Sequence, residues 1–156
     1  MNQLQAKLTR DHEELDALLQ RLAEDVEAPA GGALEATWSD FESRLVRHLQ
    51  AEERFLLPLV EASNPEEVAR TRAEHARIRD SIAELGVAIE LHTARKSDID
   101  ELIRFLREHA KHEDEALYQL AGDKAPVAVQ HRIFEDLKHA VRAVIRDVSP
   151  GSRARP

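Results

Sequence analysis

The sequence predicts an all-α fold, an up-and-down four-helix bundle with one additional C-terminal helix. Leu, Ala, Glu and Arg, which favour helices, dominate the 156 residues, whereas Gly and Pro number only 5 and 6. Apolar residues recur at alternating spacings of three and four, which marks one face of a helix. The chain is long enough to bury one core, and we expect a single domain over 1–148.

Short breaks separate the first three expected helices. The first covers about 3–27 and ends before "APAGG", and the second covers about 33–62. The third covers about 65–92, because a proline suits its first turn and Ser63 or Asn64 can cap it. Each break is short enough to make neighbouring helices antiparallel.

Two more helices complete the expected domain. Ser97 is the expected cap of the fourth, which ends near "GDKAP" and closes a bundle over about 3–122. The fifth covers about 126–148, outside the four-helix pattern. Residues 149–156, "SPGSRARP", are expected to form a flexible tail.

Each bundle helix carries a core-facing stripe. In the first it is Leu8, His12, Leu15, Leu19, Leu22 and Val26. In the second it is Leu34, Trp38, Phe41, Leu45, His48, Glu52, Phe55 and Leu59. In the third it is Val68, Thr71, His75, Ile78, Ile82, Leu85 and Ile89. In the fourth it is Ile99, Leu102, Leu106, His109, Glu113, Ala116 and Leu120.

Polar residues interrupt these stripes at similar distances along the helices from the connecting loops. If the helices fold up and down, these residues lie within about one turn of each other along the bundle. Each stripe holds one His, and two stripes add a Glu one turn later. The set is His12, His48, Glu52, His75, His109 and Glu113. Burying such groups without a partner costs several kcal/mol, and a cation reverses that cost. Their joint occurrence therefore predicts a metal site, although any single His alone is better explained as a hydrogen-bonded core residue.

The remaining histidines are interpreted as structural or surface residues. His92 closes the third helix, His131 lies off the main stripe of the fifth, and His139 faces solvent. His112 follows His109 by three residues on a flanking face. It is expected to support a ligand or to lie on the surface rather than to bind the metal.

Composition excludes several function classes. A net charge of -8 argues against a nucleic-acid binder, which normally has a basic face. The absence of Cys excludes thiolate catalysis and zinc-finger chemistry, and nitrogen and oxygen donors fit iron or manganese better than structural zinc. The longest apolar run, "FLLPLV", is too short to span a membrane, and no apolar signal core is visible. A cytoplasmic location is expected.

Four segments resemble the motifs of hemerythrin-like proteins, the HHE cation-binding domain. They are "DHEELDALL" at His12, "HLQAEE" at His48, "EHARIRDSI" at His75 and "HAKHEDEALY" at His109. The resemblance covers about 4–122. It implies a four-helix bundle that holds two iron ions with a bridging oxo or hydroxo group. A manganese or mixed pair is the alternative.

The resemblance also implies roles for the six residues. Glu52 and Glu113 would bridge the two ions, and the four histidines would complete the ligand set. This pattern is closest to the iron-centre repair branch, whose usual cysteine-bearing segment has no counterpart among these 156 residues.

Two positions depart from the oxygen-carrying hemerythrins. Those proteins have a second His four residues after the helix-3 His, where this sequence has Arg79. Arg79 is interpreted as an exposed helix residue, with pairing to an acid or attraction of an anion as the alternative. In those proteins the carboxylate of the fourth helix lies five residues after the His, which would correspond to Asp114 here. The internal repeat and the stripe favour Glu113, and Asp114 is the runner-up.

The missing His changes the number of open metal positions. Of about twelve positions on two octahedral ions, about two remain open here, against about one with a fifth His. This favours reaction with a small oxidant over reversible oxygen carriage. The expected pocket walls are Leu45, Phe55, Ile78, Ile82, Phe105 and Leu106.

The sequence thus predicts a non-haem di-iron protein that binds or reacts with O₂, NO or peroxide, in sensing, detoxification or the response to iron damage. Whether it turns over as an enzyme stays open, as does the choice between monomer and homodimer. The alternatives are iron storage or donation, and a metal-free helical interaction module. The second alternative rests on a fifth-helix stripe of Ile133, Leu137, Val141, Val144 and Val148. A ferritin-like site is set aside because no His has a Glu three residues before it.

Overall fold

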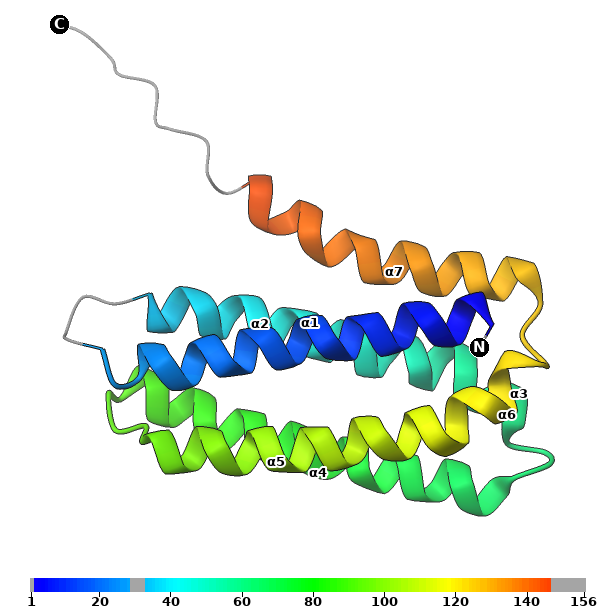
Figure 1. Cartoon of the computed structure of the whole chain (residues 1–156), viewed down its shortest axis with the longest axis horizontal. Coiled ribbons are helices and arrows are strands. Elements are labelled where there is room, and N and C mark those ends of the chain that lie inside the picture. Colours follow the sequence, from blue (N-terminus) through cyan, green and yellow to red (C-terminus); the bar gives the residue numbers. More distant parts are fainter. Residues whose placement is uncertain (1, 29–32, 147–156) are drawn as a thin grey trace, which may run out of the picture.

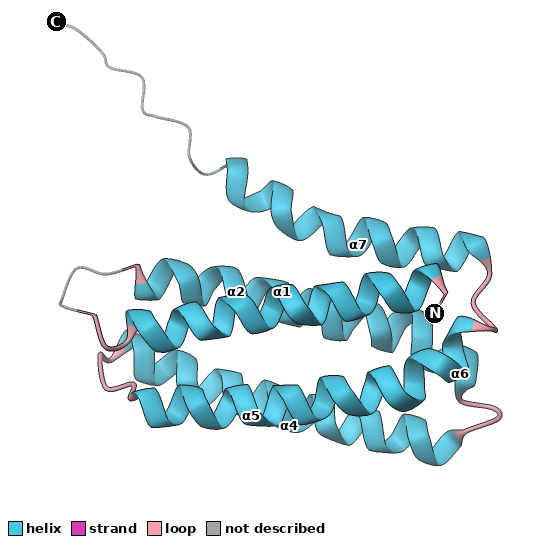
Figure 2. Cartoon of the chain, viewed as in Figure 1, coloured by secondary structure: helices cyan, strands magenta, loops and turns pink. Residues whose placement is uncertain are grey.

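The computed structural model describes residues 2–28 and 33–146, with side chains described as far as Lys138. Within these residues every regular element is helical and there is no strand (Figure 2). The predicted all-α fold is confirmed. No helix in this part of the chain is both long enough and apolar enough to cross a membrane.

Four long helical segments form the bundle, and two of them contain a π-helical turn. The first segment is α1, Gln3–Asp25. The second runs through α2, Leu34–Ala51, the π turn η1, Glu52–Leu56, and α3, Leu57–Val60. Contacts of α2 with both α1 and α4 place it between them.

The other half of the bundle repeats this pattern. It starts with α4, Pro65–Glu90. The next segment runs through α5, Lys96–His112, the π turn η2, Glu113–Leu117, and α6, Tyr118–Gly122. Because α5 contacts both α4 and α1, the four segments close into a ring (Figure 1).

The helix starts differ in part from the prediction. Asn2 caps α1 by accepting a hydrogen bond from the Gln5 N–H at 2.8 Å. Asn64 is the cap residue of α4, although its side chain makes no capping hydrogen bond. The predicted cap Ser97 is wrong, because α5 already begins one residue earlier. There Asp98 accepts from the Arg95 N–H at 3.0 Å and fixes the start of the helix.

Two apolar clusters fill the bundle, and the polar layer lies between them. The first cluster is centred on residues such as Leu22, Phe41 and Ile89, toward the loops that join α1 to α2 and α4 to α5. The second lies around Leu4 and Val60, at the end where α3 and α6 meet. A polar layer between two dry clusters is shielded from water on both sides.

Up to the two glutamates the predicted stripes are buried, except that His12, Val26 and Leu34 are half-buried; after the glutamates the stripes shift. Beyond these points the predicted core residues Phe55, Leu59, Ala116 and Leu120 are only half-buried. The buried residues are instead Leu56, Leu57, Val60, Leu117, Tyr118 and Ala121. Each π turn adds one residue per turn and so moves the stripe by one position. Its marker is an i−5 hydrogen bond, from Leu57 N–H to Glu52 and from Tyr118 N–H to Glu113.

The additional helix is α7, Val127–Arg146, which lies beside α2 and η1 (Figure 1). Ile133 and Leu137 are buried in the second cluster, so this part of the predicted stripe packs on the chain's own bundle. Val141 and Val144, like His139, lie outside the described side chains, and Val148 and the tail lie outside the described residues.

Candidate metal centre

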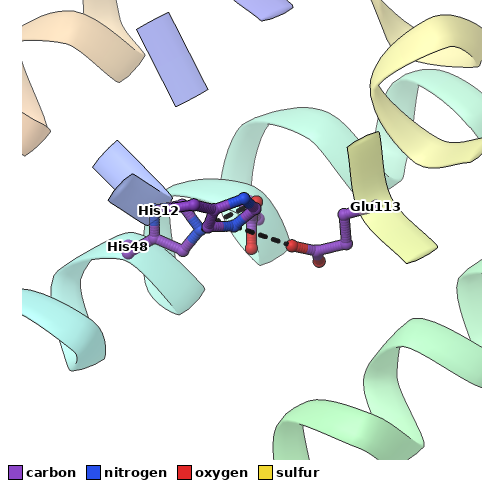
Figure 3. A group of neighbouring side chains, drawn as sticks. His12, His48 and Glu113 are labelled. Atoms are coloured by element: carbon purple, nitrogen blue, oxygen red, sulfur yellow. Dashed lines mark hydrogen bonds and ion pairs between the residues drawn. The ribbon is translucent and has the colours of Figure 1, made fainter. Parts of the chain in front are cut away.

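The six predicted residues lie together in one layer, contributed by all four bundle segments. Figure 3 shows His12, His48 and Glu113 converging from α1, α2 and η2. Glu52 joins them from η1, and the other two histidines come from α4 and α5. Five of the six are buried, and the side chain of His12 is 11% exposed.

Four donor atoms form a first group around His12 and His48. The two Nε2 atoms of these histidines lie 3.0 Å apart. Glu52 Oε1 lies 3.2 Å from His48 Nε2, and Glu113 Oε2 lies 3.3 Å from His12 Nε2. One ligand atom from each of the four residues lies within 4.8 Å of the other three, close enough to hold a metal ion.

A second group of four uses the other oxygen of each glutamate. His75 Nε2 lies 3.2 Å from Glu113 Oε1 and 3.4 Å from Glu52 Oε2. His109 Nε2 also lies 3.2 Å from Glu113 Oε1. Both glutamates therefore belong to both groups, one oxygen in each.

Hydrogen bonds among the six residues leave some of their buried polar atoms without a partner, whereas a bound cation could contact these atoms. Glu52 Oε2 and His109 Nε2 are buried and make no hydrogen bond, although both face the second group. With bonds of about 2.1 Å, adjacent ligands of a six-coordinate ion lie about 3 Å apart. Measured contacts within the two groups run from 3.0 to 3.4 Å, which is compatible with that spacing.

Without a metal, protons on the histidines balance the two carboxylates. Burial opposes the charge on Glu52, but His48 and His75 outweigh it and hold the pKa of Glu52 well below its usual value. Against the same burial, Glu113 and Glu52 raise the pKa of His75 to about 10. The pKa of His48 is also raised well above its usual value, mainly by Glu52 and Asp11 working against burial. Metal binding must displace these protons.

Buried Asp11 orients His48. Its Oδ2 lies 2.8 Å from His48 Nδ1, so this nitrogen donates the hydrogen bond and Nε2 is free to face the centre. Arg44 donates to Asp11 from Nη2 at 2.6 Å and from Nε at 3.2 Å. Burial opposes ionisation, but His48 and Arg44 lower the pKa of Asp11. The sequence interpretation missed Asp11; its position directly before His12 was the available signal.

Glu53 orients His75 in the same way. Glu53 Oε1 accepts from His75 Nδ1 at 2.9 Å, and Arg79 donates to both Glu53 oxygens at 2.7 and 2.9 Å. The interpretation of Arg79 as a merely exposed residue is therefore wrong. The alternative, pairing with an acid, is correct, because Arg79 contacts Glu53 on a neighbouring helical segment.

Glu74 orients His109 and also holds His112. Its Oε2 accepts from His109 Nδ1 at 2.8 Å and from His112 Nδ1 at 3.0 Å. His112 Nε2 lies 2.8 Å from Glu67 on its outer side. His112 thus contributes to neither group of four and instead touches the acid that positions His109. Burial notwithstanding, these histidines and Arg70 lower the pKa of Glu74 to about 2.

His12 is the exception, because its Nδ1 is buried and has no hydrogen-bond partner. The nearest acid, Asp114, has its Oδ1 3.8 Å away and accepts a hydrogen bond from Thr9 Oγ1 at 2.6 Å. Asp114 also lies outside both groups of four. The geometry therefore favours Glu113 over the runner-up, and the ligand set stays a prediction.

A small cavity of about 40 Å³ reaches the centre beside His12, His48 and His109. Its apolar lining is Leu15, Leu19, Leu45, Leu106 and Ala110. Of the predicted walls only Leu45 and Leu106 line it; the others pack in the apolar clusters. Asp16 and Arg107, which are both partly exposed, also line it, and Arg107 Nε donates to Asp16 Oδ1 at 2.6 Å.

Tyr118 is a buried member of the centre that the sequence interpretation missed. Its Oη lies 3.1 Å from His12 Nε2, 3.2 Å from Glu113 Oε2, and in hydrogen-bond contact with Glu52 Oε1. The regular stripe missed it because it lies five residues after Glu113. Five residues reach the same face only through a π turn.

Comparison with known proteins agrees with this geometry. Neither a curated protein nor a solved structure gave a significant match to the chain. The family model described as the hemerythrin HHE cation-binding domain matches residues 3–121, which is most of the chain and contains all six predicted residues. The chain therefore belongs to the hemerythrin HHE cation-binding domain family.

Proposed function

We propose that this protein holds two iron ions side by side and uses them to bind or react with a small oxidant. The observation that carries the proposal is the sharing of Glu52 and Glu113, each with one oxygen in either group of four. Carboxylates in this position bridge two ions. The thiolate-free set of imidazoles and carboxylates suits iron, with a manganese or mixed pair as the alternative.

The chain's own residues position and protect such a pair. Asp11, Glu53 and Glu74 fix three of the histidines with Nε2 toward the centre, which raises their basicity as ligands. The two apolar clusters exclude bulk water from both sides. A bound iron pair would supply one-electron redox chemistry and open positions for a ligand.

The size of the cavity supports a small ligand. A volume of about 40 Å³ exceeds what one water needs, about 10–15 Å³, but excludes an organic substrate. O₂, NO and peroxide fit this space. Sensing, detoxification and the response to iron damage all use such ligands, and the four-His, two-Glu pattern resembles the iron-centre repair branch.

Iron storage or donation without turnover is the second candidate. A third group of metal-ligating side chains favours it: Glu74, His109 and His112. This group starts at the centre and continues through His112 to Glu67, which is partly exposed. Such a path would suit an ion that enters or leaves.

The experiment is anaerobic loading with ferrous iron, removal of excess, iron analysis, and rapid mixing with O₂, peroxide or NO under optical detection. We expect about two irons per chain and a spectral change with at least one oxidant. The His48→Ala/Glu52→Ala variant should lose both. The matched control is His131→Ala/Glu115→Ala, which removes the same residue types from exposed positions.

Each other outcome has a defined meaning. Iron that binds at this stoichiometry but reacts with none of the three oxidants would favour storage or donation. No iron bound, together with an unchanged melting temperature, would overturn the metal proposal and leave the helical interaction module.

A further inference from the structure

Tyr118 Oη faces one of the two groups of four and nothing else. Its contacts are 3.1 Å to His12 Nε2, 3.4 Å to His48 Nε2 and 3.2 Å to Glu113 Oε2, plus the hydrogen bond to Glu52 Oε1. Within the described residues these are all of its hydrogen-bond contacts. The side chain is only 1% exposed.

Four contacts exceed what a phenol can use. A hydroxyl offers one donor and two acceptor sites, so at most three of the four can be satisfied together. A tyrosine with only a structural role would need only the hydrogen bond to Glu52. The additional contacts with the other three atoms of the group indicate that Oη occupies the position of a further metal ligand.

The shape of the group supports this assignment. The atoms Glu113 Oε2, His12 Nε2, His48 Nε2 and Glu52 Oε1 follow one another at 3.3, 3.0 and 3.2 Å around an open ring, and all lie within 4.8 Å of each other. Oη contacts every member of that ring. Adjacent ligands of an octahedral ion are about 3 Å apart, and an apical ligand is adjacent to all four equatorial ones.

We propose that the Tyr118 phenolate is a fifth protein ligand of the iron held by His12 and His48. This inference rests on the proposed iron pair and adds a residue outside the six predicted ones. Coordination replaces the O–H bond by an O–Fe bond, and the proton leaves to solvent as the cation enters. A neighbouring cation favours that loss, because it reverses the local charge that disfavours a phenolate.

The two ions would then differ in their open positions. With Tyr118 the group around His12 and His48 would have five protein donors, whereas the group around His75 and His109 has four. Arg79 occupies the position where the oxygen-carrying hemerythrins have a second His. It lies on α4 together with His75, and therefore on the side of the ion with four protein donors. A small oxidant would accordingly bind the iron held by His75 and His109, which the cavity reaches on its His109 side.

The test uses the full chain, loaded with ferrous iron without oxygen, then oxidised in air and freed of excess iron. Tyr118 is the only Tyr in the chain, so any iron–tyrosinate signal must come from it. We expect a visible phenolate-to-iron charge-transfer band and tyrosinate ring vibrations in the resonance Raman spectrum excited within that band. Tyr118→Phe should lose both signals and keep most of its iron.

The outcomes separate this inference from the proposed function. Two irons per wild-type chain without a tyrosinate signal would overturn the Tyr118 ligand and leave the iron pair intact. No retained iron would overturn both. A band that survives unchanged in Tyr118→Phe would also contradict the assignment. Because the wild-type Raman spectrum alone identifies the only tyrosine, the test does not depend on the folding of the variant.

Discussion

The two halves of the centre have matching inner donors and different surroundings. The α1–α2 half and the α4–α5 half each place two imidazoles against the shared glutamates. In the α4–α5 half both histidines are held by partly exposed acids, Glu53 and Glu74. In the α1–α2 half buried Asp11 holds His48, while His12 Nδ1 has no hydrogen-bond partner.

This difference shows what the repeated His-x-x-x-Glu spacing encodes. The repeat places the same inner donors in both halves, together with a π turn that begins at each glutamate. It does not repeat the acids that orient the histidines. The cavity reaches both histidines of the α1–α2 half and only one of the other half. The two ions of the proposed centre are therefore expected to be inequivalent in affinity and access. Variants can test whether the shared and the unshared residues behave accordingly.

The largest effect is expected from a residue that both halves share. Glu52→Ala should abolish tight binding of both ions, because it removes one donor from each group. Ferrous iron at about 100 times Kd stabilises by about 2.7 kcal/mol for each ion bound, or roughly 5–10 °C in Tm for each, and this shift should vanish. Calorimetry with and without iron measures it.

The matched control is Glu115→Ala, since this side chain is 68% exposed and pairs only loosely with Lys111 at 3.8 Å. It should retain the full iron-dependent shift. A Glu52→Ala protein that still binds one iron with wild-type affinity would show that Glu52 serves a single ion and is not shared.

A smaller effect, confined to one half, is expected from Asp11→Asn. Loss of a charged partner that orients a ligand typically costs 10–100-fold in metal affinity, and only His48 depends on Asp11. Competition with a chelator should show one weakened ion and one unchanged ion. Asp100→Asn is the control, because Asp100 is an exposed partner of Lys96. Equal weakening of both ions would contradict independent support of the two halves.

The metal-free protein should lose stability as the pH rises. Burial alone would lower the pKa of His75, but its contacts with Glu113 and Glu52 outweigh burial and raise the pKa from 6.5 to about 10. A raised pKa contributes stability that is complete below pH 6.5 and is lost as the pH rises toward 10. The free energy of unfolding in urea, measured on chelator-treated protein across this range, should fall.

Iron-loaded protein should behave in the opposite way over the lower part of that range, because iron binds the unprotonated imidazoles. The gain in stability on loading should therefore grow with pH. Metal-free stability that stays level or rises between pH 6.5 and about 10 would show that His75 is not held as a cation by the two glutamates.

The smallest effect is expected at the cavity opening. Arg107→Ala removes the ion pair with Asp16, whose atoms are partly exposed, so fold and iron content should stay unchanged. The rate of NO binding to the ferrous protein should rise a few-fold. Arg104→Ala, an exposed Arg on the same helix, should leave the rate unchanged. A slower rate in Arg107→Ala would indicate that the guanidinium attracts the ligand instead of covering the opening.

Helix periodicity was sufficient to predict the bundle and the six converging residues. Every stripe residue of α4 from Val68 to Ile89 is buried, because no irregular turn interrupts that helix. The stripes failed only beyond Glu52 and Glu113. No residue type marks a π turn, so a regular 3-4 spacing carried the prediction onto Phe55 and Ala116 and missed Tyr118.

The roles of the orienting acids could not be assigned from the sequence, for a different reason. Asp11 lies beside the α1 stripe, and Glu74 lies beside that of α4; each acts on a histidine of a neighbouring helix. Which flanking residue turns toward a neighbour depends on how the helices rotate against each other, and ridges packing in grooves fix that only in the assembled bundle. Arg79 was misread for the same reason.

The most direct test of the central claim is X-ray absorption at the iron edge of the loaded, oxidised protein. Two ions that share Glu52 and Glu113 should give nitrogen and oxygen neighbours only, together with scattering from a second iron within about 4 Å. Full iron loading without an iron neighbour would contradict a shared centre, and so would a protein that retains no iron.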